Sequence, residues 1–270
     1  MQANKWLLCW RLGRVGVHLL YGCAQILLFF GRASRTQRQA IIGRWSRQLL
    51  HICGMRLTVL PQDMAVDSTG GRMLVANHIS WLDIFAINAV VPMRFVAKED
   101  ILGWPLIGWL VARADTVFIR RSCRASALAV ADTVAQVLRE GDRVAVFPEG
   151  TTTDGASIKP FKSSLFQAAV NAQATVQPLA LRYPLPQGGR NPASAYYDDI
   201  TLWQSLCAVL QQPQSQVEVH FLSPINTHGL NRQQICQQAQ TQIADFLAQY
   251  RSTEDVNAEA WRELPLYDAH

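Results

Sequence analysis

The first 60 residues contain no aspartate or glutamate, although the whole chain of 270 residues has 20 acidic side chains. The same segment holds nine basic residues, so the other 210 keep 16 of the 25 lysines and arginines, for a net charge of −4. No recognised nucleic-acid-binding motif accompanies the basic residues, which alternate with long apolar runs. The charge distribution therefore argues against nucleic acid as a partner and predicts attraction of the N-terminal segment to an anionic membrane surface.

Cysteine pairs at metal-ligand spacing are also absent. The six cysteines are scattered along the chain and none belongs to a C-x-x-C pair. This pattern argues against a disulfide framework and a zinc site, and is typical of a protein in a reduced compartment. We expect neither a metal nor a redox cofactor.

The chain lacks an uninterrupted apolar run of the roughly 20 residues that a membrane span needs. The longest run, residues 15–30, is broken by His18 and Gln25, and the basic sequence that follows it does not resemble a signal-peptide cleavage site. Extending the run back to Trp6 includes Arg11 and Arg14, which we expect to snorkel to the membrane surface.

A second helix is predicted over residues 36–53, with its larger apolar side chains on one side, as in a helix that lies in a membrane interface. We therefore predict that residues 1–54 form a membrane-tethering helical hairpin. The alternative is a pair of helices packed on the protein's own core.

Residues 55–250 alternate between short apolar runs and amphipathic segments, which predicts an α/β domain with a mostly parallel, mixed sheet flanked by helices. Residues 251–270 are polar and are expected to form a loose tail. The predicted strands are 56–60, 73–76, 94–97, 116–119, 143–147, 176–181 and 216–222. One helix is predicted to begin near Ile84. The other predicted helices are a short pair over residues 101–112 and single helices over 126–139, 163–172 and 231–250.

The sequence Asn77-His78-Ile79-Ser80-Trp81-Leu82-Asp83 follows the buried strand 73–76. Open α/β sheets place their chemistry at the ends of such strands. If Ser80 caps the next helix, Asp83 is its third residue and His78 lies just outside it, so that the carboxylate can approach the imidazole. An aspartate bound to one ring nitrogen fixes the tautomer and leaves the other nitrogen as a general base. The alternative is a capping box in which Asp83 only binds backbone N–H groups.

Two further polar groups follow predicted strands. Arg120 and Arg121 end the strand 116–119, and a guanidinium binds phosphate oxygens in bidentate fashion. Glu149, Gly150 and Thr151 combine a carboxylate, a residue that permits close backbone approach, and donors suited to a phosphate or glycerol. The alternatives are a solvated arginine pair and an ordinary turn.

Taken together and in order, these motifs resemble those of the glycerolphosphate and lysophosphatidate acyltransferases. Asn77-His78 to Asp83 is similar to the NHxxxxD motif of that family. The second block resembles residues 117–121, with Arg121 at the phosphate-binding position and Arg120 where the family commonly has an acid. The third resembles residues 147–151 and continues at Phe161-Lys162, where only the first lysine of the family's pair is present. The fourth resembles residues 176–179.

The resemblance implies transfer of an acyl chain from acyl-CoA or acyl carrier protein to the hydroxyl of a lysophospholipid, with 1-acylglycerol-3-phosphate as the expected acceptor. His78 would act as the general base and Asp83 would orient it. The expected substrate-binding residues are Arg121, Glu149, Gly150, Thr151, Arg120, Lys98 and Lys162. We expect the enzyme on the cytoplasmic face of a bacterial inner membrane.

Three alternatives remain open at this point. The first alternative is that the acceptor is another lysolipid, such as lyso-ornithine lipid. His78 and Asp83 instead activate water, which gives a membrane-bound acyl-thioester hydrolase, although a hydrolase needs no phosphate-binding loop. The third alternative is a lipid-binding protein without catalytic activity, which the intact pair of His78 and Asp83 disfavours.

Overall fold

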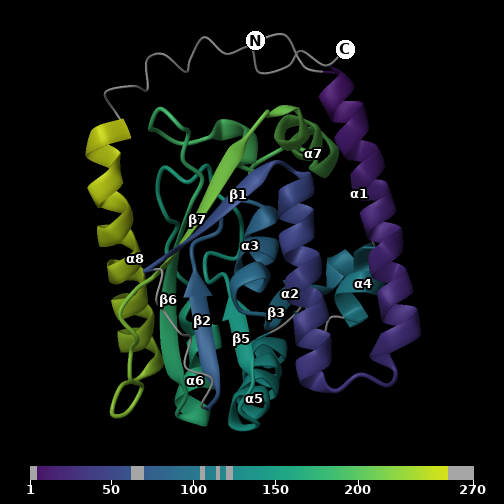
Figure 1. Ribbon diagram of the computed structural model, residues 1–270. Coiled ribbons are helices and arrows are strands. Elements are labelled where there is room, and N and C mark those ends of the chain that lie inside the picture. The colour runs from purple at the N-terminus through teal and green to yellow at the C-terminus, as the bar shows by residue number, and fades with distance from the viewer. Residues whose placement is uncertain (1–4, 62–69, 104–106, 114–115, 120–123, 255–270) are drawn as a thin grey trace.

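The computed structural model describes residues 5–61, 70–103, 107–113, 116–119 and 124–254. In this part of the chain seven strands form one sheet in the order β1-β7-β6-β2-β5-β3-β4 (Figure 1). All neighbouring strands are parallel except β6 and β7, so the predicted mostly parallel, mixed sheet is confirmed. The strands are β1 (Met55–Leu60), β2 (Arg72–Ala76), β3 (Arg94–Lys98), β4 (Val117–Ile119), β5 (Arg143–Val146), β6 (Thr175–Arg182) and β7 (Ser215–Phe221).

The central strand β2 is buried on both faces, and its side chains alternate between two hydrophobic cores. Leu74 and Ala76 face the core shared with α2, α3 and α7, whereas Met73 and Val75 face the core shared with α5, α6 and α8. A strand covered on both faces is expected to be a continuous apolar run, as this one is. The central strand is therefore a fixed platform for the residues that follow it.

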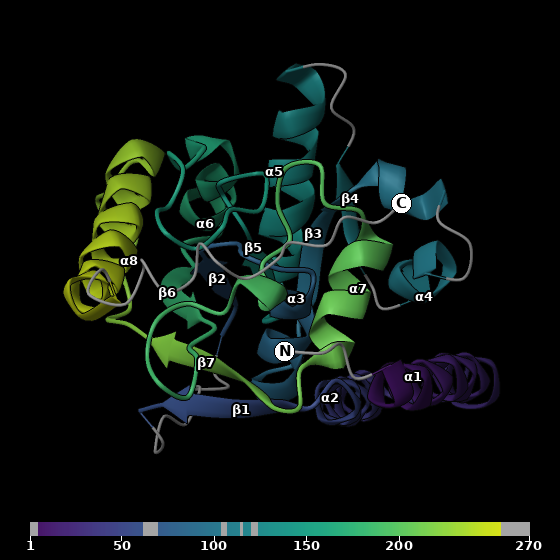
Figure 2. The same cartoon turned by 90° about the horizontal axis from the view of Figure 1, so that it is seen from above.

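Helices cover both faces of the sheet, as Figure 2 shows from above. α3 (Leu82–Val90), α7 (Leu202–Gln211) and the second N-terminal helix lie on one face, and the other face carries α5 (Arg124–Arg139), α6 (Phe166–Ala172) and α8 (Arg232–Glu254). The short elements are 3₁₀ turns η2 (Glu99–Gly103), η3 (Ser163–Leu165) and η4 (Pro192–Ser194), and the short helix α4 (Ile107–Arg113).

No helix or strand is predicted between residues 183 and 214, where the structure has η4 and α7. The signal for α7 was present in the sequence. Thr201 and Gln204 form a capping box in which each side chain binds the other residue's backbone N–H. The capping pair Thr201-x-x-Gln204 before an apolar run is the signature that was overlooked.

The N-terminal residues form α1 (Lys5–Gln25), a π-helical turn η1 (Ile26–Phe30) and α2 (Arg35–Ile52), which are joined by a short connection. α1 and α2 lie side by side at one edge of the molecule (Figures 1 and 2). Among the residues that the structure describes, one helix, Lys5–Phe30, is long and apolar enough to cross a membrane by length and composition, and little of it is buried within the protein.

The two helices of the hairpin differ in their packing. α2 is part of the protein body, because Leu49 and Leu50 are buried in the core and a Cβ on Gly43 would meet Pro92 at 2.9 Å. The alternative of a helix packed on the protein's own core thus describes α2. Most of the large exposed apolar side chains, by contrast, lie on α1 and η1.

Arg11 does not snorkel to a membrane surface, so that expectation was wrong. Its guanidinium is buried and donates to the carbonyl oxygens of Leu210, Gln212 and Pro213 at the end of α7. The last carbonyls of a helix have no partner within the helix, so a buried guanidinium there is well placed. Arg11 instead joins α1 to the end of α7.

Candidate active site

The end of β2 is held in place by Asn77. The side-chain amide of Asn77 donates to the carbonyl of Leu181 at 3.1 Å, and its oxygen accepts from the N–H of the same residue at 2.8 Å. Asn77 therefore continues the pairing of β2 with β6 by one side chain. The next residue, His78, leaves the sheet at a fixed point.

His78 and Asp83 are in direct contact. Nδ1 of His78 lies 2.8 Å from Oδ2 of Asp83, and Asp83 is fully buried while 19% of the His78 side chain is exposed. Because Nδ1 is bound to a carboxylate, Nε2 is the nitrogen that accepts a proton. Among the described residues, the ring makes no other hydrogen bond.

Asp83 is held by four hydrogen bonds. Besides the imidazole, Oδ2 accepts from the backbone N–H groups of Ile79 at 2.7 Å and Ser80 at 3.0 Å. Oδ1 accepts from the hydroxyl of Tyr183 at 2.6 Å. Asp83 thus binds backbone N–H groups and the imidazole at once, so the capping alternative and the predicted contact both describe it.

The helix start differs slightly from the predicted one. α3 begins at Leu82 with Trp81 at the N-cap, so Asp83 is the second helical residue and not the third. The Ser80 hydroxyl accepts from the N–H of Leu82 at 3.3 Å. The turn between His78 and Leu82 removes the separation of about 140° that five residues on a continuous helix would impose.

The imidazole lies flat on Phe147, the last residue before the Pro148-Glu149-Gly150 loop. The ring centroids are 4.0 Å apart and the planes differ by 10°. The backbone of His78 is bound from the same loop, because Thr153 donates to its carbonyl through N–H at 2.9 Å and through Oγ1 at 3.3 Å. The third motif therefore supports the histidine from β5.

Glu149 is buried, and both of its carboxylate oxygens accept from backbone N–H groups. Oε1 accepts from His78 and Oε2 from Lys159, each at 2.7 Å. Burial raises the pKa of Glu149, and the two N–H donors oppose that rise. Glu149 therefore links the turn that begins at His78 to Lys159, at the far side of the loop that follows β5.

Gly150, Thr151 and Lys162 lie together at the outer side of this loop. Gly150 has φ of +71°, and a Cβ there would meet Nζ of Lys162 at 2.7 Å. Thr151 and Lys162 are exposed. A left-handed glycine beside an ammonium group leaves room for a ligand oxygen to approach the backbone.

Three predicted binding residues cannot be placed in full. Arg120 and Arg121 lie outside the described residues, and for Lys98 the structure describes only the backbone at the end of β3. β3 pairs in parallel with β4 and β5, and β5 pairs in parallel with β2. The ends of all four strands therefore lie at the same edge of the sheet.

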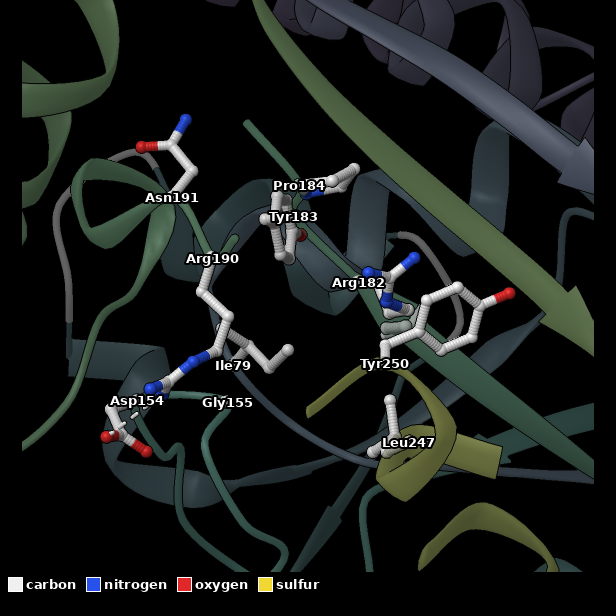
Figure 3. A pocket seen from close by; sticks show the side chains of 11 residues that line it. Ile79, Asp154, Gly155, Arg182, Tyr183, Pro184, Arg190, Asn191, Leu247 and Tyr250 are labelled. Atoms are coloured by element: carbon white, nitrogen blue, oxygen red, sulfur yellow. Dashed lines mark hydrogen bonds and ion pairs between the residues drawn. The ribbon is translucent and has the colours of Figure 1, made fainter. Parts of the chain in front are cut away.

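A small cavity of about 30 Å³ lies on the other side of the same loop (Figure 3). Ile79, Gly155 and Tyr183 contribute to its wall, and the exposed pair of Asp154 and Arg190 closes one end at 3.4 Å. None of His78, Asp83 and Glu149 lines it. The cavity is therefore not where the imidazole would meet a substrate.

Tyr183 and Thr153 are site residues that were not predicted from the sequence. Tyr183 is fully buried, and burial together with the neighbouring Asp83 carboxylate raises its pKa well above 10. Nothing in the sequence links a tyrosine to an aspartate 100 residues earlier. Thr153 is the third of three consecutive threonines after Gly150, and this run of hydroxyl groups beside the third motif is a sequence signal for a further site residue.

The comparisons with known proteins agree with one another. The sequence profile of the acyltransferase family matches residues 58–182. The lyso-ornithine lipid O-acyltransferase of Pseudomonas aeruginosa is 34% identical over 209 residues, which cover 76% of this chain and 78% of that protein. The 1-acyl-sn-glycerol-3-phosphate acyltransferase of Neisseria gonorrhoeae is 38% identical over 158 residues, which cover 58% of this chain and 62% of that protein.

A solved structure shares the fold. The 1-acyl-sn-glycerophosphate acyltransferase of Thermotoga maritima superposes with a TM-score of 0.65 at 18% identity, over 92% of this chain and 96% of that one. At this level of identity the likeness concerns the arrangement of strands and helices alone.

Proposed function

Because the chain belongs to the acyltransferase family that includes the 1-acylglycerol-3-phosphate and lyso-ornithine lipid enzymes, we propose that it transfers an acyl chain to a lysophospholipid hydroxyl. The expected acceptor is 1-acylglycerol-3-phosphate, and the product is then phosphatidate. The expected donor is a thioester, either acyl-CoA or acyl carrier protein. The observation that carries the proposal is the contact of 2.8 Å between His78 and the buried Asp83.

The proposed reaction uses the imidazole as a general base. Nε2 of His78 takes the proton of the acceptor hydroxyl as the hydroxyl oxygen attacks the thioester carbonyl. The C–S bond then breaks, and the leaving thiolate takes the proton from the imidazolium. The Asp83 carboxylate keeps the proton on Nδ1 and stabilises the imidazolium between these two steps. No covalent acyl-enzyme is required.

The acceptor head group is proposed to bind on the exposed side of the third motif and at the end of β4. Gly150 and Thr151 supply backbone and hydroxyl donors, and Lys162 supplies a cation beside them. Arg121, Arg120 and Lys98 are proposed to complete the phosphate site. Arginine is suited to this role because its planar fork matches two phosphate oxygens.

A second acceptor, lyso-ornithine lipid, is favoured by one observation. The relative from Pseudomonas aeruginosa that is named for this acceptor matches over 209 residues, whereas the match to the Neisseria gonorrhoeae enzyme named for the phosphate acceptor covers 158. Arg120 stands where the family commonly has an acid, a departure that is consistent with a different head group.

The membrane location is proposed from the N-terminal helix. The Arg11 contacts hold α1 against the catalytic domain, so we propose that α1 and η1 lie in the membrane interface and do not cross the bilayer. The scattered cysteines and a thioester donor favour the cytoplasmic face.

The test is an acyl-transfer assay of the purified full chain against lysophosphatidate and lyso-ornithine lipid, each with both donor types. Product should form with one acceptor, and His78→Ala and Asp83→Asn should lower the rate by roughly 10²–10⁴-fold without unfolding the protein. Thioester loss that does not depend on acceptor would instead identify a hydrolase. Near-normal turnover by folded His78→Ala would refute the mechanism.

A further inference from the structure

A groove lies between α1 and α2 and opens to solvent. It has a volume of about 830 Å³, which lies within the roughly 300–1,000 Å³ of a typical small-ligand pocket. Its lining residues come from α1 and α2 alone, and they are Cys9, Trp10, Gly13, Arg14, Val17, His18, Tyr21, Arg47, Gln48, His51 and Ile52. The stretch of α1 from Cys9 to Tyr21 is about 18 Å long at 1.5 Å per residue.

The shape of the groove is fixed, because specific contacts hold the two helices together at one end of it. The rings of His18 and Trp45 stack with centroids 4.5 Å apart. Nε2 of His18 lies 3.0 Å from the Trp45 carbonyl, and Nε1 of Trp45 donates to the His18 carbonyl at 3.1 Å. A Cβ on Gly22 would meet the Trp45 ring at 2.6 Å, whereas a Cβ on Gly13 would meet nothing within 4 Å. The helices therefore touch at Gly22 and leave space beside Gly13.

The charges in the groove have one sign. Arg14, Arg47 and His51 lie among apolar walls, and the lining contains no aspartate or glutamate. The Arg14 guanidinium lies 5.9 Å from the Trp10 ring centroid, and Arg47 donates one N–H to the Ala89 carbonyl at 2.5 Å. A guanidinium has five N–H donors, so each retains donors for an anion. The groove thus combines apolar side chains with basic ones from both helices.

We propose that the groove binds one anionic phospholipid of the bilayer, with an acyl chain along Val17 and Tyr21 and the head-group phosphate at Arg14, Arg47 and His51. This inference rests on the proposed seating of α1 in the membrane interface. A soluble anion would not contact the apolar side chains. A zwitterionic lipid such as phosphatidylcholine carries the same phosphate but adds a choline cation, which the basic side chains repel. Basic pockets between helices at a membrane surface are suited to anionic head groups for the same reason.

The test is native mass spectrometry of the full chain in mild detergent with added phosphatidylglycerol or phosphatidylcholine. The unaltered chain should retain one phosphatidylglycerol. Gly13→Leu places a side chain in the groove at a position where a Cβ meets nothing within 4 Å, and it should lower retention at least tenfold. Gly16→Leu is the matched control, because a Cβ there also meets nothing within 4 Å but the residue does not line the groove.

The charge requirement is tested by Arg47→Gln with His51→Gln, which should bring phosphatidylglycerol retention down to that of phosphatidylcholine. Arg44→Gln, an exposed charge on α2 outside the groove, should change nothing. Equal retention of both lipids by the unaltered chain, or equal loss in both leucine variants, would refute the site. Acyl transfer is assayed on the same preparations, so a failure of the proposed reaction is seen separately from a failure of lipid binding.

Discussion

Asp83 fixes the geometry of the proposed catalytic pair. Its carboxylate accepts from two backbone N–H groups, from the imidazole and from the Tyr183 hydroxyl, so the orientation of the carboxylate group is fixed. A base held by a fully hydrogen-bonded carboxylate keeps one tautomer and one orientation. At the scale of single residues, the groups that position the pair should therefore affect turnover more than substrate binding.

Tyr183→Phe tests this positioning directly. The change leaves the buried Oδ1 of Asp83 without a donor, which should lower the free energy of unfolding by about 1–3 kcal/mol. Turnover should fall while the KM for the acceptor stays unchanged, because Tyr183 is fully buried and does not reach the substrate. Steady-state kinetics with varied acceptor provide the measurement, and a rise in KM alone would contradict the role.

The same tyrosine has a pH signature. Because its folded pKa lies well above 10, the folded chain keeps a proton that the unfolded chain releases. The stabilising contribution is complete below about pH 10 and is lost as pH rises above that value. Denaturant unfolding of the wild-type chain should therefore show a steeper loss of stability between about pH 9.5 and 11 than Tyr183→Phe. Parallel curves would show that Tyr183 ionises normally.

Glu149→Gln distinguishes two roles for that residue. Both oxygens accept from backbone N–H groups, and an amide can accept with only one of its two polar atoms. The variant should displace the His78 backbone and lower kcat at nearly constant acceptor KM. The opposite pattern, a raised KM at constant kcat, would indicate that Glu149 contacts the acceptor head group, as the family resemblance implies.

At the scale of elements, a feature could be predicted from the sequence when the residues that form it are close together in the chain. All seven strands were predicted because each is either a short apolar run or, as in β1 and β7, a run of alternating apolar and polar residues. The contact between His78 and Asp83 was predicted because both lie in one turn. Tyr183 and Arg11 could not be assigned in this way. Their partners lie about 100 and 200 residues away, and neither residue type nor spacing encodes such a contact.

The loop after β5 provides an element-scale prediction with a matched control. Gly150 and Gly229 have φ of +71° and +73°, so alanine should cost roughly 1–2 kcal/mol of stability at either site. Only at Gly150 would the added Cβ displace Lys162, because nothing lies within 4 Å at Gly229. The acceptor KM should rise several-fold in Gly150→Ala and stay constant in Gly229→Ala. Equal KM values in both variants would place Lys162 away from the acceptor.

The joint between α1 and α7 gives a second element-scale prediction. Arg11→Met removes a buried donor to three carbonyls and should destabilise the chain by at least about 1.5–3 kcal/mol. Arg44→Met, an exposed change on α2, is the control and should have little effect. Denaturant unfolding of both variants provides the measurement. Equal stability in both would show that the joint does not stabilise the fold.

At the scale of the whole molecule, exposed apolar surface is concentrated at one end of the chain. Of the ten large apolar side chains that are exposed among the described residues, eight lie between Trp6 and Phe29. Deleting residues 1–60 would be a poor test of their role, because that segment includes β1 and the core residues of α2. A test of membrane seating must change the exposed surface and leave the packing intact.

Replacing Leu27, Leu28 and Phe29 with glutamine meets this requirement. These side chains are 72%, 66% and 54% exposed, so their loss should leave the fold and turnover in detergent unchanged. Full burial of such a side chain in a membrane contributes about 1.5–3 kcal/mol, so binding to anionic vesicles should weaken at least tenfold. High salt should weaken binding of the unaltered chain only in part, because apolar insertion persists when the charges are screened. If the triple variant still sediments fully with vesicles, α1 and η1 do not seat the enzyme on the membrane.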